Sequence, residues 1–167
     1  MNRALLLAVA GLAVAAAVVF SSFYLSRGFR PVASGDIKKI RWHGLDGRSA
    51  AAIVDFRIAN AGDYAVEVRT IRVQAQPLTQ PAAPIPGDPV AAVDAARLLA
   101  AYPEIGPQYN DTLKIRDEIA ARTTQDRMVV ARFEVPLDSL EGKVRLRILV
   151  EDVNGHVAEI AEPAKRP

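Results

Sequence analysis

The chain has 167 residues, of which half are hydrophobic and none is cysteine. This length suits one globular domain with short appendages, and the missing cysteine excludes a disulfide framework, a thiolate metal site and a cysteine nucleophile. Six of the 21 basic residues but only one of the 19 acidic residues precede position 42, so the rest of the chain is slightly acidic and does not favour nucleic-acid binding.

The first 26 residues carry a single charge, Arg3, and the stretch from Ala4 to Leu25 carries none. About 20 apolar residues in a helix, with about 1.5 Å of rise each, cross a hydrocarbon core of about 30 Å. We therefore expect residues 1–26 to form a transmembrane anchor. The alternative is a cleaved secretory signal, for which the small residues 13–15 supply a cleavage pattern.

A basic strip follows this apolar stretch, and its members are Arg27, Arg30, Lys38, Lys39 and Arg41. We expect the strip to lie at the membrane surface, where each basic group near anionic lipid contributes about 1 kcal/mol; a flank that only lies in solvent is the alternative. Basic residues after the apolar stretch favour a cytoplasmic domain, whereas the export-like start favours the extracytoplasmic side. We expect the periplasmic side and leave the cytoplasmic orientation open.

Residues 27–35 contain glycine, serine and proline and are expected to form a linker. The expected domain spans residues 36–162, and the tail 163–167 is expected to be loose. Alternation of apolar and polar side chains predicts strands with one buried face. These strands cover 37–42, 51–59, 64–73, 129–135, 144–150 and 156–160.

Two local features refine this pattern. The apolar phase of the third strand changes near Arg69, which predicts a β-bulge, and Asn154-Gly155 predicts a hairpin with a two-residue turn between the last two strands. The apolar sides of the strands predict a core between two sheets. Its expected members are Phe56, Ile58, Val66, Phe133, Leu146 and Ile148.

A different composition separates the early strands from the late ones. Residues 77–123 form an expected insertion, because seven of the eleven prolines lie between positions 76 and 107, and Asp88-Pro89 starts a short helix that ends before Pro103. So long a connection costs ordering entropy that a compact domain does not need. We therefore expect a partner-binding surface there, made of Tyr102, Ile105 and Tyr109; the alternative is that these side chains cap an open end of the sheets.

The stretch VDFRIANAGDYAVEVRTIRVQ, residues 54–74, resembles the strand–turn–strand signature of immunoglobulin-like sandwich families, especially late-embryogenesis-abundant type 2 domains. In that signature a strand ends in Asn-Pro-Asn before an alternating strand. Asn60 and Asp63 fit it, whereas Ala61 and Gly62 replace the expected proline and asparagine. The resemblance implies a seven-stranded antiparallel sandwich with a role in stress protection or membrane-proximal interaction, and no catalytic residues.

Few residues carry reactive chemistry. His43 and His156 are the only histidines, and each lies near a glycine in an expected turn or strand end, so no metal site and no cofactor is expected. Neighbouring carboxylates such as Asp117 and Glu118 would point to opposite faces of a strand, which argues against a catalytic pair. The chain is therefore not expected to be an enzyme.

The expected fold is mainly β, an antiparallel immunoglobulin-like sandwich with a helical insertion, preceded by one N-terminal transmembrane helix. The expected function is that of a membrane-anchored, non-enzymatic interaction or scaffold domain in a cell-envelope assembly. Its expected partners are membrane lipid, through the N-terminal helix, and another membrane or envelope protein, with no nucleic acid. The alternative is a domain that binds lipid or a small anion at the membrane surface.

Overall fold

The computed structural model describes residues 14–15, 17–21, 33–79 and 82–162. The chain divides into two units, Met1–Arg30 and Pro31–Pro167. In the first unit, the described residues are helical.

The transmembrane helix expected from the sequence is contradicted. In the part of the chain that the structure describes, no helix has the length and the apolar character that crossing a membrane requires. Of the expected span 4–25, residues 4–13, 16 and 22–25 lie outside the described residues, and so do Arg27, Arg30 and the tail 163–167. The uncharged length of residues 4–25 was the only feature that indicated a membrane span.

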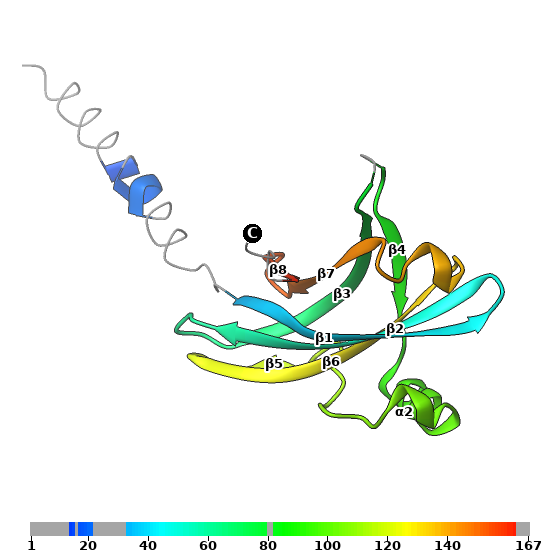
Figure 1. Ribbon diagram of the computed structural model, residues 1–167. Coiled ribbons are helices and arrows are strands. Elements are labelled where there is room, and N and C mark those ends of the chain that lie inside the picture. The colour runs from blue at the N-terminus through cyan, green and yellow to red at the C-terminus, as the bar shows by residue number, and fades with distance from the viewer. Residues whose placement is uncertain (1–13, 16, 22–32, 80–81, 163–167) are drawn as a thin grey trace, which may run out of the picture. The chain divides into compact units, whose positions relative to one another are not determined.

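The second unit is built mainly of β-strands (Figure 1). The strands are β1 (Ala33–Asp46), β2 (Ser49–Asn60), β3 (Val66–Pro77), β4 (Ile85–Pro89), β5 (Glu118–Ile119), β6 (Thr123–Phe133), β7 (Val144–Asp152) and β8 (Val157–Ala161). The helical elements of this unit are α2 (Ala92–Ala101) and the single 3-10 turns η1 (Pro103–Ile105) and η2 (Leu137–Ser139).

The sheet closes on itself, which makes the expected two-sheet sandwich wrong. The strand order is β4-β6-β2-β1-β8-β7-β3-β5, and β4 also pairs with β3, so seven strands form a barrel and β5 extends it beside β3. Gly87 of β4 lies opposite Val73 of β3, while Asp88 lies opposite Arg132 of β6. Because β4 pairs with β3 and with β6, it joins what would otherwise be the edges of two sheets.

The sequence missed β4 because this strand lies in the proline-rich stretch that was assigned to the insertion. Pro86 and Pro89 both belong to β4, and a proline cannot donate to a strand ladder. The strand needs few donors, since it forms three residue pairs with β3 and two with β6. The expected insertion at 77–123 therefore supplies a strand of the barrel as well as its helix.

The interior of the barrel is filled with apolar side chains. All six residues expected in the core are at most 4% exposed, and they belong to one buried cluster. They are Phe56, Ile58, Val66, Phe133, Leu146 and Ile148. The strand phases inferred from the sequence are therefore confirmed, although the core lies inside one closed sheet.

One local prediction is confirmed, and a second is confirmed in part. The register of β3 against β7 shifts between Val68 and Thr70, where the bulge was expected. The hairpin around Asn154-Gly155 joins β7 to β8, and Gly155 has φ +83°. Its loop is longer than the two residues expected, because the buried carboxylate of Asp152 accepts hydrogen bonds from the amides of Asn154 and His156, both at 2.8 Å.

A second, smaller core lies on the outer face of β2 and β6. Ala51 and Ile53 of β2 and Met128 of β6 pack there against Ala95 and Leu99 of α2. Figure 1 shows α2 beside β2 and β6 and away from β3, β7 and β8. β2 is therefore buried on both faces over most of its length, which its alternating sequence did not indicate.

Candidate functional site

A buried ion pair fixes the chain that follows α2 to the barrel. Arg41 of β1 donates from Nη2 to Oδ2 of Asp55 of β2 at 3.0 Å, and the two side chains are only 9% and 6% exposed. Arg41 Nη1 donates to the carbonyl oxygens of Pro107 at 2.9 Å and Ile105 at 3.3 Å. Asn110 donates from Nδ2 to Oδ1 of Asp55 at 2.9 Å. One cation and one anion thus determine the path of residues 105–110.

This network places Tyr109 on the surface. Its side chain is 55% exposed, and its ring centroid lies 4.8 Å from Lys39 Nζ and 4.9 Å from Arg41 Cζ. Cations over an aromatic face are attracted to the π electrons, so both basic residues restrict the ring. Lys39 is exposed and forms no ion pair within the described residues, which leaves its charge available to a partner.

The other two residues of the expected partner-binding surface have different environments. Ile105 is 8% exposed and belongs to the small outer core. Tyr102 is half-buried, and its ring centroid lies 4.3 Å from that of His43. His43 Nδ1 also lies 3.9 Å from a carboxylate oxygen of Glu104. The structure therefore brings all three expected residues to one region, but only Tyr109 is well exposed.

The basic strip is divided in a similar way. Lys38 forms an ion pair with Asp36, Lys39 lies over Tyr109, and Arg41 is buried against Asp55. The sequence contained one signal for the last contact: Asp55 is a charged residue between apolar neighbours in a strand that is otherwise buried. A buried carboxylate requires a partner, and Arg41 on the neighbouring strand supplies it.

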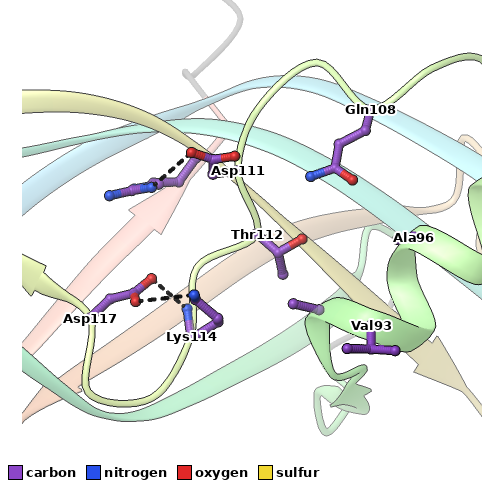
Figure 2. Close-up of a pocket in the computed structure, with 9 residues that line it drawn as sticks. Val93, Ala96, Gln108, Asp111, Thr112, Lys114 and Asp117 are labelled. Carbon is purple, nitrogen blue, oxygen red and sulfur yellow. Dashed lines mark hydrogen bonds and ion pairs between the residues drawn. The ribbon is translucent and has the colours of Figure 1, made fainter.

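A cavity of about 390 Å³ lies between α2 and the loop that leads to β5 (Figure 2). Figure 2 shows Val93 and Ala96 of α2 facing Gln108 and Thr112 of the loop. Thr112 is buried, and its hydroxyl has no hydrogen-bond partner among the described residues. One wall of the cavity is therefore apolar and the other is polar.

The charges around this cavity balance. Arg127 of β6 lies 3.7 Å from a carboxylate oxygen of Asp111, and Lys114 Nζ lies 3.9 Å from one of Asp117. The backbone amide of Lys114 also donates to Asp117 at 2.9 Å. Two cations each next to a carboxylate give the cavity no net preference for an anion.

A second hollow, of about 450 Å³, is lined by residues 108–111 and by Asp126 of β6. Asp126 accepts two hydrogen bonds from Arg57, at 2.7 and 2.8 Å. These bonds hold the pKa of Asp126 below its ordinary value of 3.8. The carboxylate beside the Tyr109 loop is therefore ionised at neutral pH.

Among the described residues, no group of three or more His, Cys, Asp or Glu side chains lies close enough together to hold a metal ion. The two histidines belong to separate contacts. The ring of His43 contacts that of Tyr102 at an interplanar angle of 45°, whereas His156 Nδ1 lies 3.1 Å from Oδ2 of Asp152 in the β7–β8 hairpin.

No protein-family model, no curated protein and no solved structure matches the chain. The resemblance of residues 54–74 to late-embryogenesis-abundant type 2 domains is therefore neither supported nor opposed by a relative.

Proposed function

We propose that the chain is a non-enzymatic interaction domain that binds a partner protein through an insertion face. We define the insertion face as the exposed side chains of Lys39, Val93, Gln108, Tyr109 and Asp111. The observation that carries this proposal is the exposed tyrosine, which a buried ion pair positions and which two cations restrict.

The energetics of the insertion support this function. The barrel is closed once β4 is in place, so the stretch from α2 to Asn110 adds only the small outer core. A buried ion pair contributes little net stability compared with apolar residues of similar size, because desolvation of the two charges opposes their attraction. The pair of Arg41 and Asp55 is therefore better explained by the conformation that it imposes on residues 105–110 than by the stability that it adds.

The chemistry of the face suits a protein partner. Tyrosine buries a large area at the cost of few rotamers, and it is enriched among the residues that dominate binding energy. A ring that is already restricted loses less conformational entropy on binding. Lys39, without an internal counter-ion in the described residues, favours an acidic group on the partner. An envelope protein is the partner class that the sequence suggested.

The alternative, a domain that binds lipid or a small anion, gains less support. The interior of the barrel is filled by side chains, and the cavity beside α2 has balanced charges. We therefore place the function at the surface of the insertion.

The experiment compares two tyrosines of similar exposure, 55% for Tyr109 and 58% for Tyr64. Tyr109→Ala changes the insertion face, whereas Tyr64→Ala changes a residue that is 58% exposed in the turn before β3. Both variants and the parent chain, each carrying the same affinity tag, are crosslinked in cells, and the captured proteins are quantified by mass spectrometry. We expect the amount of specifically captured partner to fall about tenfold with Tyr109→Ala, at an unchanged Tm, and to stay the same with Tyr64→Ala. Equal recovery by both variants would refute the proposal.

Tyr102→Ala provides a third measurement. Because Tyr102 is half-buried against His43 and borders the outer core, its truncation is expected to lower the Tm. This variant separates damage to the support of the face from damage to the face itself.

A further inference from the structure

β1 has a long edge that no described strand covers. On one side β1 pairs with β2 from Ala33 to Asp46. On the other side β8 pairs with β1 only at Gly35 and Asp36, and within residues 33–79 and 82–162 no further strand takes up that edge. Figure 1 shows β8 as a short strand while β1 continues far beyond it. Among the described residues, the backbone groups after Asp36 on this edge therefore have no ladder partners.

β7 borders the same opening from the opposite side. Its pairing with β8 begins at Arg147, opposite Ala161, so residues 144–146 extend past β8. The amide of Leu146 donates to Oε1 of Glu162 at 3.0 Å. A side-chain oxygen thus takes the place that a carbonyl oxygen of a neighbouring strand would occupy. We call the opening between residues 37–44 of β1 and residues 144–146 of β7 the seam.

Apolar side chains of the main core reach the surface at the seam. Ile40 and Trp42 of β1 and Val144 of β7 pack against the core cluster but remain partly exposed. The ring centroid of Trp42 lies 5.8 Å from that of Phe133, which is fully buried. These three partly exposed side chains give the seam an apolar floor that is continuous with the core.

The outer rim of the seam is basic. Lys39 of β1 and Arg145 of β7 are exposed, and neither forms an ion pair within the described part of the chain. Lys143, just before β7, donates to the carbonyl oxygen of Asp138. The register of β1 also shifts between Ile37 and Lys39. Bulges and lysines on an open edge discourage pairing with arbitrary strands, so they select for a segment that carries compensating negative charge.

We propose that the seam binds an extended acidic segment of a partner polypeptide as an additional β-strand. The segment continues the line of β8, parallel to β1 and antiparallel to β7. Main-chain hydrogen bonds to the two edges provide affinity, and alternate side chains provide specificity. Apolar residues face Ile40, Trp42 and Val144, and acidic residues face Lys39 and Arg145. This proposal shares Lys39 with the insertion face and uses none of its other residues.

Trp42, the only tryptophan of the chain, provides the signal for a test. The full-length protein is titrated with an end-blocked peptide of eight residues in which valine and glutamate alternate, and Trp42 fluorescence is recorded. We expect the emission to shift to shorter wavelength on binding. Amide hydrogen exchange of β1 between positions 38 and 44 is expected to be fast in the free protein and slow in the complex.

Three comparisons make the result specific. The same peptide with alternate amides methylated is expected not to bind, because it cannot complete the ladder. A peptide with lysine in place of glutamate is expected to bind at least about tenfold more weakly. Arg145→Glu is expected to lower the affinity for the acidic peptide. Arg116→Glu, in the loop beside the other end of β7, is expected to leave that affinity unchanged.

The proposal fails if the amides of β1 between 38 and 44 are already protected in the protein alone, because the edge would then be occupied by the chain itself. It also fails if the methylated and unmethylated peptides bind equally. Neither outcome bears on Tyr109, so failure here and failure of the proposed function are distinguishable.

Discussion

Replacing Asp55 with alanine removes the central anion of the insertion network. The substitution deletes the ion pair with Arg41 and the hydrogen bond from Asn110. It leaves the guanidinium of Arg41, whose side chain is 9% exposed, without a counter-charge among the described residues; its Nη2 also donates to the sulfur of Met128, at 3.9 Å. Breaking a buried pair from one side costs about 3 to 5 kcal/mol, since the remaining charge is not compensated.

Urea unfolding of the full-length chain measures this loss, with the slope of the transition as a check on two-state behaviour. Asp126→Ala is the matched control, because Asp126 also pairs with an arginine between β-strands, but that pair is about half exposed. We expect the control to cost less than about 1 kcal/mol. The double variant Arg41→Met/Asp55→Ala is expected to lose less than Asp55→Ala alone. If Asp55→Ala unfolds at the same urea concentration as Asp126→Ala, the ion pair is not buried as the structure shows.

Three further predictions test other contacts. Asn60→Asp is expected to cost about 3 kcal/mol in urea unfolding, because the amide of Asn60 donates to the carbonyl oxygens of Tyr64 and Ile119, and a carboxylate would repel both; an unchanged midpoint would contradict this. Gly87→Ala is expected to lower stability by about 1 to 3 kcal/mol, since its Cβ would lie 2.5 Å from the ring of Phe133, and equal melting of the parent and the variant would show that the ring moves aside. Asp46→Asn is expected to be less stable than the parent at pH 7 and to match it in strong acid: hydrogen bonds from the amides of Arg48 and Ser49 hold the pKa of Asp46 below 3.8, so its contribution is present above that value and is lost as the pH falls through the lowered pKa. A difference that persists at low pH would refute this reasoning.

Local patterns predicted the strands well and their closure poorly. Alternation identified the faces of β2, β6 and β7 that contain Phe56, Phe133 and Ile148, because a half-buried strand repeats every two residues. Whether the outermost strands pair with each other depends on contacts between distant residues, which no local period records. Here closure depends on five residues, Ile85–Pro89, whose prolines resemble those of a loop.

The candidate site was predicted only in part, again because contacts between distant residues determine it. Proline and aromatic content indicated the region of Tyr102 and Tyr109, but the sequence could not show which side chains would be exposed. Arg41 was assigned to the membrane surface because it follows other basic residues. Its burial depends on Asp55 of the neighbouring strand. The register of β1 against β2 determines that Asp55 lies near Arg41, and this register could not be inferred from the sequence.

β1 connects the two proposed surfaces, which share Lys39, and the alternation of its other side chains separates them. Lys39, Arg41 and His43 contact the insertion on the outer side, whereas Ile40 and Trp42 pack toward the core at the seam. Consecutive residues of a strand point to opposite faces, so substitutions along β1 should alternate in their consequences. His43→Ala is expected to reduce partner capture through the insertion face without changing the affinity for the acidic peptide, because the His43 side chain contacts Tyr102 and is not one of the side chains that face the peptide. Ile40→Ala is expected to lower the affinity for the acidic peptide and to leave partner capture unchanged. Comparing the two variants in both assays tests whether one strand carries two independent contacts; if each substitution impairs both activities equally, β1 transmits the change across the wall and the two surfaces form one site.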